Sequence, residues 1–266
     1  MLPKPASLGV EYASRFQDVS MVESYKYRPP YPAEVFDILD SLITTEPRRV
    51  LDVGCGTGAI TRFLVDHVEQ VDAVDFSENM LAMAKTLPNG DNLRIRWLYG
   101  KVEDVELEPP YALVTAGGSL HWMDWSVVMP RFHDLLTPGG YIAIIVEDST
   151  LGPWDNNMLE VIQRYSTNKE FQAYDLVEEL EQRNLFKKVG EKRTHPVPFV
   201  QSVDDFIESY HSRNGFSRDW MSVEDATAFD QEAKRRLMAS YPDGIISFQV
   251  VGDVVWGIPQ RIWRGE

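Results

Sequence analysis

A glycine turn between two short apolar runs constrains the fold of this chain more than any other feature. Residues 49–59 read RVLDVGCGTGA, and a second apolar run over residues 71–74 ends in Asp75. This pattern predicts a strand, a tight turn, a helix and a parallel second strand, which together make one βαβ nucleotide-binding unit. The glycines let the backbone approach a ligand closely, and the start of the helix offers unpaired N–H groups. Asp75, 21 positions after Gly54, is placed to accept hydrogen bonds from both hydroxyls of a ribose.

The residues after this unit continue the alternation of strands and helices. Helical spacing of apolar residues predicts helices from Pro32, after residue 60, from Ser77 and over residues 125–136. Apolar runs predict strands at 50–53, 71–75, 93–98, 111–116 and 141–146. We therefore expect an α/β fold with a Rossmann-like, doubly wound, mostly parallel seven-stranded sheet and right-handed crossovers.

The pattern changes after residue 147. We expect helices near 158–165 and 176–180, a strand at 194–200, and helices that begin after the capping residues Ser202 and Ser222. The run 245–256 predicts a last strand that joins the sheet antiparallel.

The expected organisation is one domain, 1–266, with four parts. Residues 1–31 form an irregular N-terminal arm over the site, because Pro29, Pro30 and Pro32 forbid a helix there. Residues 32–147 are the cofactor-binding core, 148–240 a helical lid with one strand that selects the substrate, and 241–266 the final strand.

Composition excludes several classes of partner. The 41 acidic against 26 basic residues give a formal charge of -15, which argues against nucleic-acid binding. The single cysteine, Cys55, excludes an internal disulfide and fits a reducing compartment. No segment reaches the about 18 apolar residues of a membrane helix, so a cytoplasmic protein without a membrane partner is expected. The five histidines lack metal-ligand spacing, and a monomer and a homodimer both remain open.

The glycine turn alone leaves two cofactors open. Gly54-x-Gly56-x-x-Ala59 satisfies the relaxed dinucleotide fingerprint, and Gly54-x-Gly56-x-Gly58 the tighter pattern. One alternative is therefore an NAD-dependent oxidoreductase. The other is an enzyme that uses a different adenosine cofactor.

The residues around the turn favour the second alternative. Leu51-Asp52-Val53-Gly54-Cys55-Gly56-Thr57-Gly58 resembles the first motif of class I S-adenosylmethionine-dependent methyltransferases. Three later motifs of that family have similar counterparts, in the expected order: Asp75-Phe76-Ser77-x-x-Met80-Leu81, Gly100-x-Val102-Glu103-Asp104 and Leu135-Leu136-x-Pro138-Gly139-Gly140. Tyr27-Arg28-Pro29-x-Tyr31-Pro32 and His121-Trp122-Met123-Asp124 resemble the type 11 branch, which includes trans-aconitate methyltransferases. The resemblance covers residues 25–146 and fades over 150–240.

This resemblance implies the cofactor S-adenosylmethionine and the product S-adenosylhomocysteine. It places the methionyl part along the glycine turn and Gly117, the ribose on Asp75, the adenine beside Phe76 and Met80, and the carboxylate on Arg28. The full set of implied cofactor-binding residues is Arg28, Asp52, Gly54, Cys55, Gly56, Asp75, Phe76, Met80, Val102, Glu103 and Gly117.

The expected activity is O- or N-methylation of a small organic molecule, such as a metabolite or natural product. His121, just past the fourth expected strand, is the candidate catalytic base, and a purely structural role for its ring stays open. Trp122, Trp154 and Tyr25 are candidates for the substrate pocket. A non-catalytic protein that only binds the cofactor is a further alternative.

Overall fold

A single mixed sheet forms the centre of the protein. The computed structural model describes residues 8–150, 155–170 and 174–261, and in these residues the sheet has eight strands in the order β3-β2-β1-β4-β5-β8-β6, with β7 paired to β8. The strands are β1 (Arg49–Val53), β2 (Gln70–Asp75), β3 (Ile95–Tyr99), β4 (Tyr111–Gly117), β5 (Leu136–Ser149), β6 (Phe186–Arg193), β7 (Val197–Ser202) and β8 (Ile245–Pro259). Strands β1 to β5 are parallel, and β8 runs antiparallel to β5, β6 and β7. The expected doubly wound α/β fold with an antiparallel last strand is confirmed.

Helices cover both faces of this sheet. They are α1 (Val10–Ser14), α2 (Val19–Ser24), α3 (Ala33–Leu42), α4 (Thr61–Leu64), α5 (Glu78–Thr86), α6 (Trp125–Leu135), α7 (Asp155–Tyr165), α8 (Leu176–Gln182), α9 (Val203–His211) and α10 (Val223–Ser240), with short 3₁₀ turns η2 (Arg15–Gln17), η3 (Tyr25–Tyr27) and η4 (Leu120–Trp122). One apolar core joins the sheet to α3, α4 and α5, and a second joins the other face to α6 and α8.

Serine caps fix the starts of three helices where the sequence predicted them. The Ser77 hydroxyl accepts a hydrogen bond from the Met80 N–H at 3.2 Å. Ser202 accepts from Asp205 N–H and Ser222 from Asp225 N–H, each at 3.0 Å. Each cap satisfies a backbone donor that the first turn of a helix leaves unpaired.

The N-terminal arm is more regular than expected. Residues 8–28 contain α1, α2, η2 and η3, so the prediction of a wholly irregular arm was wrong. The prolines restrict only their own neighbourhood, where residues 28–32 are extended or irregular.

The sheet has one strand more than predicted. The missed strand, β6, reads FKKVGEKR, and most of its residues are exposed or half-buried. A charged edge strand lacks the apolar alternation from which strands are predicted, and its backbone pairs with β8 instead. The strand predicted at 194–200 is β7, shifted towards the C-terminus.

Two other elements differ in length. Helix α4 is a single turn, and its Phe63 is 52% exposed and stacks on Phe36 with ring centroids 4.5 Å apart. Strand β5 is longer than predicted at both ends.

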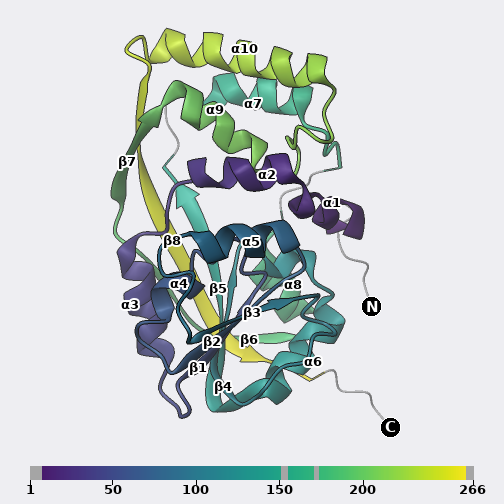
Figure 1. Ribbon diagram of the computed structural model, residues 1–266, viewed down its shortest axis with the longest axis vertical. Helices are drawn as coiled ribbons and strands as arrows, with labels where there is room; N and C mark the ends of the chain where they lie inside the picture. The colour runs from purple at the N-terminus through teal and green to yellow at the C-terminus, as the bar shows by residue number, and fades with distance from the viewer. Residues whose placement is uncertain (1–7, 151–154, 171–173, 262–266) are drawn as a thin grey trace.

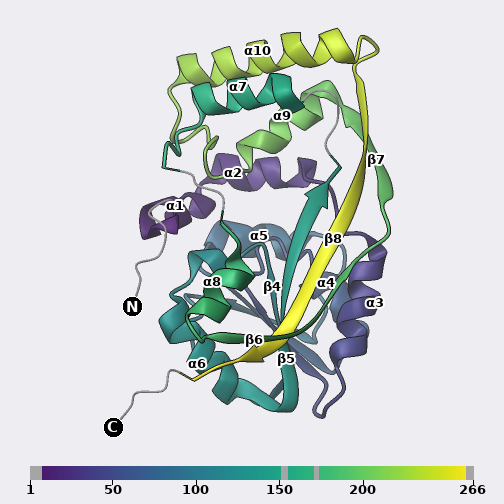
Figure 2. The ribbon, with the colours of Figure 1, turned by 180° about the vertical axis from the view of Figure 1, so that it is seen from behind.

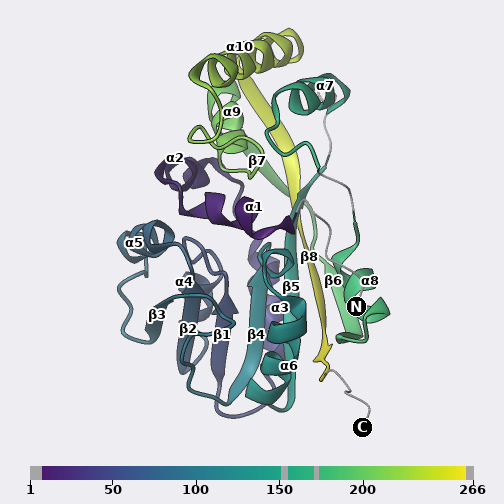
Figure 3. The same cartoon turned by 90° about the vertical axis from the view of Figure 1, so that its right-hand side faces the viewer.

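Helices α7, α9 and α10 form a separate layer with its own core at one end of the molecule (Figure 1). The arm helices α1 and α2 lie between this lid and the carboxyl ends of the parallel strands, as the edge-on view shows (Figure 3). Strand β8 runs from the lid to the opposite end of the sheet, pairing first with β7 and then with β5 and β6 (Figure 2). No helix in the described residues is long and apolar enough to cross a membrane.

Candidate active site

The turn after β1 contains three glycines with left-handed backbone conformations, and only one of them faces open space. Gly54, Gly56 and Gly58 have φ values of 63°, 54° and 74°. A methyl group on Gly54 would lie 2.5 Å from Cβ of Ser119, and one on Gly58 would lie 2.5 Å from the Trp97 ring. A methyl group on Gly56 would meet nothing within 4 Å. Gly54 and Gly58 therefore permit packing, whereas Gly56 leaves room for a ligand against the backbone.

Asp75 lies directly beside this turn. One carboxylate oxygen accepts a hydrogen bond from the Gly56 N–H at 2.8 Å, and the other accepts from the Ser77 N–H at 2.8 Å. Burial and, to a smaller extent, the charge of nearby Asp52 raise the pKa of Asp75 to about 6, although the two hydrogen bonds act in the opposite direction. The structure thus brings together Gly56 and Asp75, two of the residues that the sequence predicted to bind the cofactor.

Asp52 has a different environment from Asp75. Its carboxylate is buried and accepts hydrogen bonds from Thr61 Oγ1 at 2.6 Å and from Thr115 Oγ1 at 2.8 Å. Burial raises the pKa of this carboxyl group. Asp52 consequently links β1 to α4 and β4 by hydrogen bonds, and this holds the start of the glycine turn in place.

Cys55 is also turned into the protein. Its side chain is buried, which raises the pKa of the thiol, and its N–H donates to the carbonyl of Val74 at 3.0 Å. The backbone of Cys55 therefore holds the turn against β2.

The end of β4 is covered by the arm. A methyl group on Gly117 would lie 2.5 Å from Cδ1 of Ile60 and 2.9 Å from the hydroxyl oxygen of Tyr31. The Ser119 hydroxyl, two residues later, donates to the carbonyl of Val53 at 2.5 Å. These contacts bring the ends of β1 and β4 together with Ile60 and with Tyr31 of the arm.

The remaining predicted cofactor residues border the same end of the sheet. Met80 and Val102 are buried, and Phe76 is half-buried. The Glu103 carboxylate accepts from the Asp124 N–H at 2.9 Å. The carbonyl of Phe76 accepts from the Gln17 side chain at 3.1 Å, which places the arm beside this edge.

Arg28 joins the arm to the lid. Its guanidinium donates to the Ser212 hydroxyl at 2.8 Å and to the Ser212 carbonyl at 2.6 Å, and lies 4.3 Å from the ring centroid of Tyr25. Burial raises the pKa of Tyr25, the charge of Arg28 lowers it by less, and the charge of Asp75 makes a smaller contribution that raises it. Tyr25, a predicted pocket residue, is therefore electrostatically coupled to the acid of the glycine turn.

His121 and Trp122 lie in η4, just after β4. Their ring centroids are 4.6 Å apart, and the Trp122 ring is 5.3 Å from that of Phe16 in the arm. Trp122 thus packs between His121 and the arm. Trp154 lies outside the described residues.

Sequence reasoning did not place Tyr31, Ser119 and Glu147 at the site. Glu147 follows the apolar run of β5, and Ser119 follows β4, so both lie where parallel strands end. Position at a strand end is the signal that identifies such residues. Tyr31 belongs to the Tyr27–Pro32 motif, but its contact with Gly117 depends on how the arm folds back.

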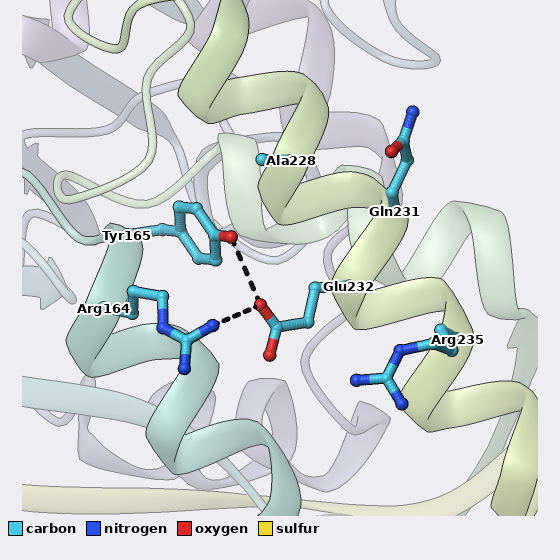
Figure 4. Close-up of a pocket in the computed structure, with 6 residues that line it drawn as sticks. All are labelled: Arg164, Tyr165, Ala228, Gln231, Glu232 and Arg235. Carbon is cyan, nitrogen blue, oxygen red and sulfur yellow. Dashed lines mark hydrogen bonds and ion pairs between the residues drawn. The ribbon is translucent and has the colours of Figure 1, made fainter.

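A surface depression of about 460 Å³ lies elsewhere, between α7 and α10 (Figure 4). It is lined by Arg164, Tyr165, Ala228, Gln231, Glu232 and Arg235. Glu232 accepts from Arg164 at 2.8 Å and from Tyr165 at 3.2 Å, so two of the charged groups of the depression, Glu232 and Arg164, pair with each other. It is far along the chain and in space from the glycine turn, at the outer side of the lid.

Comparison of the sequence with protein families finds one domain. Residues 50–140, from β1 into β5, match the family described as "Methyltransferase domain". Trans-aconitate 2-methyltransferase of Pseudomonas paraeruginosa is 28% identical over 221 residues, which are 79% of this chain and 78% of that protein. An uncharacterized methyltransferase of Mycobacterium tuberculosis is 33% identical over 141 residues, and this match spans about half of each protein, 52% and 54%.

Solved structures share the fold over most of the chain. A putative type II methyltransferase from Anaeromyxobacter dehalogenans superposes with a TM-score of 0.62 at 20% identity, covering 88% of this chain and 99% of that one. A SAM-dependent methyltransferase from Thiobacillus denitrificans, in complex with S-adenosylhomocysteine, gives a TM-score of 0.50 at 16% identity and covers 90% and 97%.

Proposed function

We propose that this chain, which matches the methyltransferase domain family over residues 50–140, is a class I S-adenosylmethionine-dependent methyltransferase that transfers the methyl group to a small organic acceptor by O- or N-methylation. One observation carries this proposal. The open backbone at Gly56 and the Asp75 carboxylate meet at the carboxyl ends of β1 and β2, where open α/β sheets bind their ligands.

The residues at this end of the sheet fit the cofactor. Asp75 has acceptor capacity beyond its two backbone hydrogen bonds, since a carboxylate offers about four lone-pair sites, and it would take the ribose hydroxyls. The methionyl part would follow Gly54, Gly56 and Gly117. The adenine would lie by Phe76, Met80, Val102 and Glu103.

Arg28 remains the candidate partner for the cofactor carboxylate. Its present bonds to Ser212 fix the arm against the lid, so cofactor binding and arm position are coupled through this residue. Asp52 and Cys55 would act on the cofactor only through the shape of the turn, since both side chains are buried.

When bound, the sulfonium cofactor supplies an activated methyl group. The protein has to orient the acceptor and exclude water. The arm and the lid serve this purpose, since Phe16 packs on Trp122 and the Tyr31 hydroxyl covers Gly117. His121 is the candidate base for a hydroxyl acceptor, because it lies just beyond β4.

One arginine of the lid, Arg218, is already paired and so is not available to a polyanionic acceptor such as trans-aconitate, which the relative's name specifies. Arg218 pairs with Glu208 at 2.7 and 2.8 Å and with Asp230 at 3.1 Å, so its charge is neutralised by two acids. The paired Arg218 therefore gives no support for a polyanionic acceptor.

Calorimetric titration with S-adenosylhomocysteine and with NAD tests the proposal. S-adenosylhomocysteine should bind and raise the melting temperature, and NAD should do neither. Binding of NAD alone would instead favour an oxidoreductase.

A labelled-methyl assay against alcohols, phenols, amines and carboxylic acids then tests catalysis. Transfer to at least one class is expected. Tight S-adenosylhomocysteine binding without transfer to any class would favour a protein that only binds the cofactor.

A further inference from the structure

Strand β5 extends beyond the end of its parallel neighbour. Gly117, the last residue of β4, pairs with Ile145, but β5 continues to Ser149. Side chains alternate between the faces of a strand, so Glu147 lies on the same face as Ile145 and Gly117. Glu147 therefore lies on residues 146–149 of β5, which extend past the end of β4 and are called the ledge below.

This ledge is bordered by the end of the arm. On β8, Gly252 pairs with Glu147, and the space above Gly252 is filled by Val35 and bordered by Pro32, whose Cδ lies 3.8 Å from the position of a methyl group there. The neighbouring residue in the arm is Tyr31, whose hydroxyl covers Gly117. Glu147 and Tyr31 thus flank the same point from β5 and from the arm.

The half-buried Glu147 carboxylate has no hydrogen bond or ion pair to another side chain in the part of the chain that the structure describes. The charged groups that act on it are Arg28 of the arm, Arg213 after α9 and Asp148 on its own strand. Burial and Asp148 raise its pKa, and the two arginines lower it by less, so the net pKa is raised. A carboxylate in such a place is available to a ligand.

We propose that Glu147 and the Tyr31 hydroxyl form the acceptor subsite, and that the acceptor presents an uncharged amine to the methyl group. This inference rests on the proposed function. Because Gly117 borders the methionyl part of the proposed cofactor, the ledge at Glu147 lies on the acceptor side of that group.

An amine acceptor suits the negatively charged carboxylate of Glu147, because positive charge forms on the nitrogen during methyl transfer. The nitrogen lone pair forms the N–C bond, the electron pair of the C–S bond returns to sulfur, and the positive charge moves from sulfur to nitrogen. Glu147 faces the new charge and accepts one proton from that nitrogen, leaving a neutral methylated amine. A carboxylate acceptor would instead meet a like charge at Glu147 and would need no base.

Sinefungin tests the subsite without a known acceptor. In this analogue of the cofactor, a carbon that bears a primary amine replaces the methylated sulfur. If Glu147 faces the transferred methyl, wild-type protein should bind sinefungin at least about tenfold more tightly than S-adenosylhomocysteine at pH 8, as expected for one charge-assisted hydrogen bond. Glu147→Gln should lose this preference and keep its affinity for S-adenosylhomocysteine within about threefold.

Asp148→Asn is the matched control, because this neighbouring acid lies on the other face of β5 and pairs with Arg193 at 2.7 Å. It should retain the preference. If Glu147→Gln fails to fold, the wild-type protein gives a second measurement. The ratio of the two affinities should fall as the pH is lowered through the pKa of Glu147, which burial raises, because protonation removes its charge while any effect of Asp75 on the shared ribose cancels in the ratio.

An equal preference in wild type and Glu147→Gln, or a ratio independent of pH, would overturn the acceptor subsite. Methyl transfer to carboxylic acids alone would overturn the proposal that the acceptor is an amine. Failure of the wild-type protein to bind either analogue would instead contradict the proposed function itself.

Discussion

The carboxylate of Asp75 and the backbone N–H of Gly56 are joined by a hydrogen bond of 2.8 Å, so the acid that ends β2 directly supports the turn that follows β1. The pKa of this carboxyl group is about 6, close to neutral pH. Ligand binding at this turn should therefore depend on pH.

We expect the affinity for S-adenosylhomocysteine to be full above pH 6 and to decrease below it. Ribose hydroxyls donate to the ionised carboxylate, so binding lowers the pKa of Asp75 from its value in the free protein. Each pH unit below 6 should then weaken binding by up to about tenfold, and binding at pH 6 should release about half a proton per bound ligand. Titration calorimetry in two buffers measures both effects. Asp75→Asn should bind weakly with no such pH dependence, and an unchanged profile in this variant would exclude Asp75 as the source.

Gly56→Ala and Gly58→Ala should separate ligand binding from stability. The new methyl group at position 56 enters open space where the cofactor is proposed to lie, whereas at position 58 it collides with Trp97. Both substitutions carry the cost of a positive φ, about 1–2 kcal/mol. Gly58→Ala adds about 1–3 kcal/mol for the clash. We expect urea unfolding to show the larger loss for Gly58→Ala, and Gly56→Ala to lose at least about tenfold in S-adenosylhomocysteine affinity while folded. Normal binding by Gly56→Ala would refute the close approach.

Thr115→Val should destabilise the protein without reaching the ligand. It removes one of the two threonine donors to the buried Asp52 carboxylate, which accepts from Thr115 at 2.8 Å. The loss of a hydrogen bond to a buried charged group should lower the free energy of unfolding by about 1.5–3 kcal/mol. Thr227→Val is the control, since that exposed hydroxyl bonds only its own helix, at Val223. Equal effects in the two variants would show that Asp52 does not depend on Thr115.

His121→Ala should lower turnover more than it lowers S-adenosylhomocysteine affinity if the ring acts as a base. The lost general-base contribution is typically about 10²–10⁴-fold in rate. His133→Ala, on α6 beside Asp134, serves as the control and should change neither quantity. A parallel loss of turnover and affinity would instead assign His121 a structural role beside Trp122.

Arg28→Ala should loosen the arm from the lid. It removes the hydrogen bonds to Ser212 and the contact with the Tyr25 ring. We expect faster amide hydrogen exchange over residues 19–28 and weaker cofactor binding, because the arm covers the end of β4. Lys26→Ala, an exposed neighbour, should leave exchange and binding unchanged. Loss of affinity without any change in exchange would favour a direct contact between Arg28 and the cofactor.

The sequence by itself determined the βαβ unit, the parallel core and the antiparallel last strand. These elements follow from local patterns, in which apolar residues recur with the period of a strand or helix and glycines and capping serines mark the ends. For the same reason the family resemblance over residues 25–146 identified S-adenosylmethionine as the cofactor that donates the methyl group.

Only the tertiary structure decided what each of three buried acids does. Asp52 lies in β1, Asp72 and Asp75 lie in the neighbouring β2, and all three are buried. Asp52 accepts hydrogen bonds from two threonines, whereas Asp75 accepts one from the backbone of the glycine turn. Asp72, nearer the start of β2, faces Tyr111 and Arg96. Local sequence does not encode which partners meet an acid, because those partners come from distant segments.

The charged edge strand β6 and the folded-back arm depend on the same kind of information. Strand β6 has little apolar signal and exists because β8 offers it a backbone to pair with. Tyr31 reaches Gly117, and Glu147 rises above β4, only because strands of unequal length and an N-terminal segment meet at one end of the sheet. The sequence therefore specified the glycine turn, and the packing of distant segments decided which residues surround it.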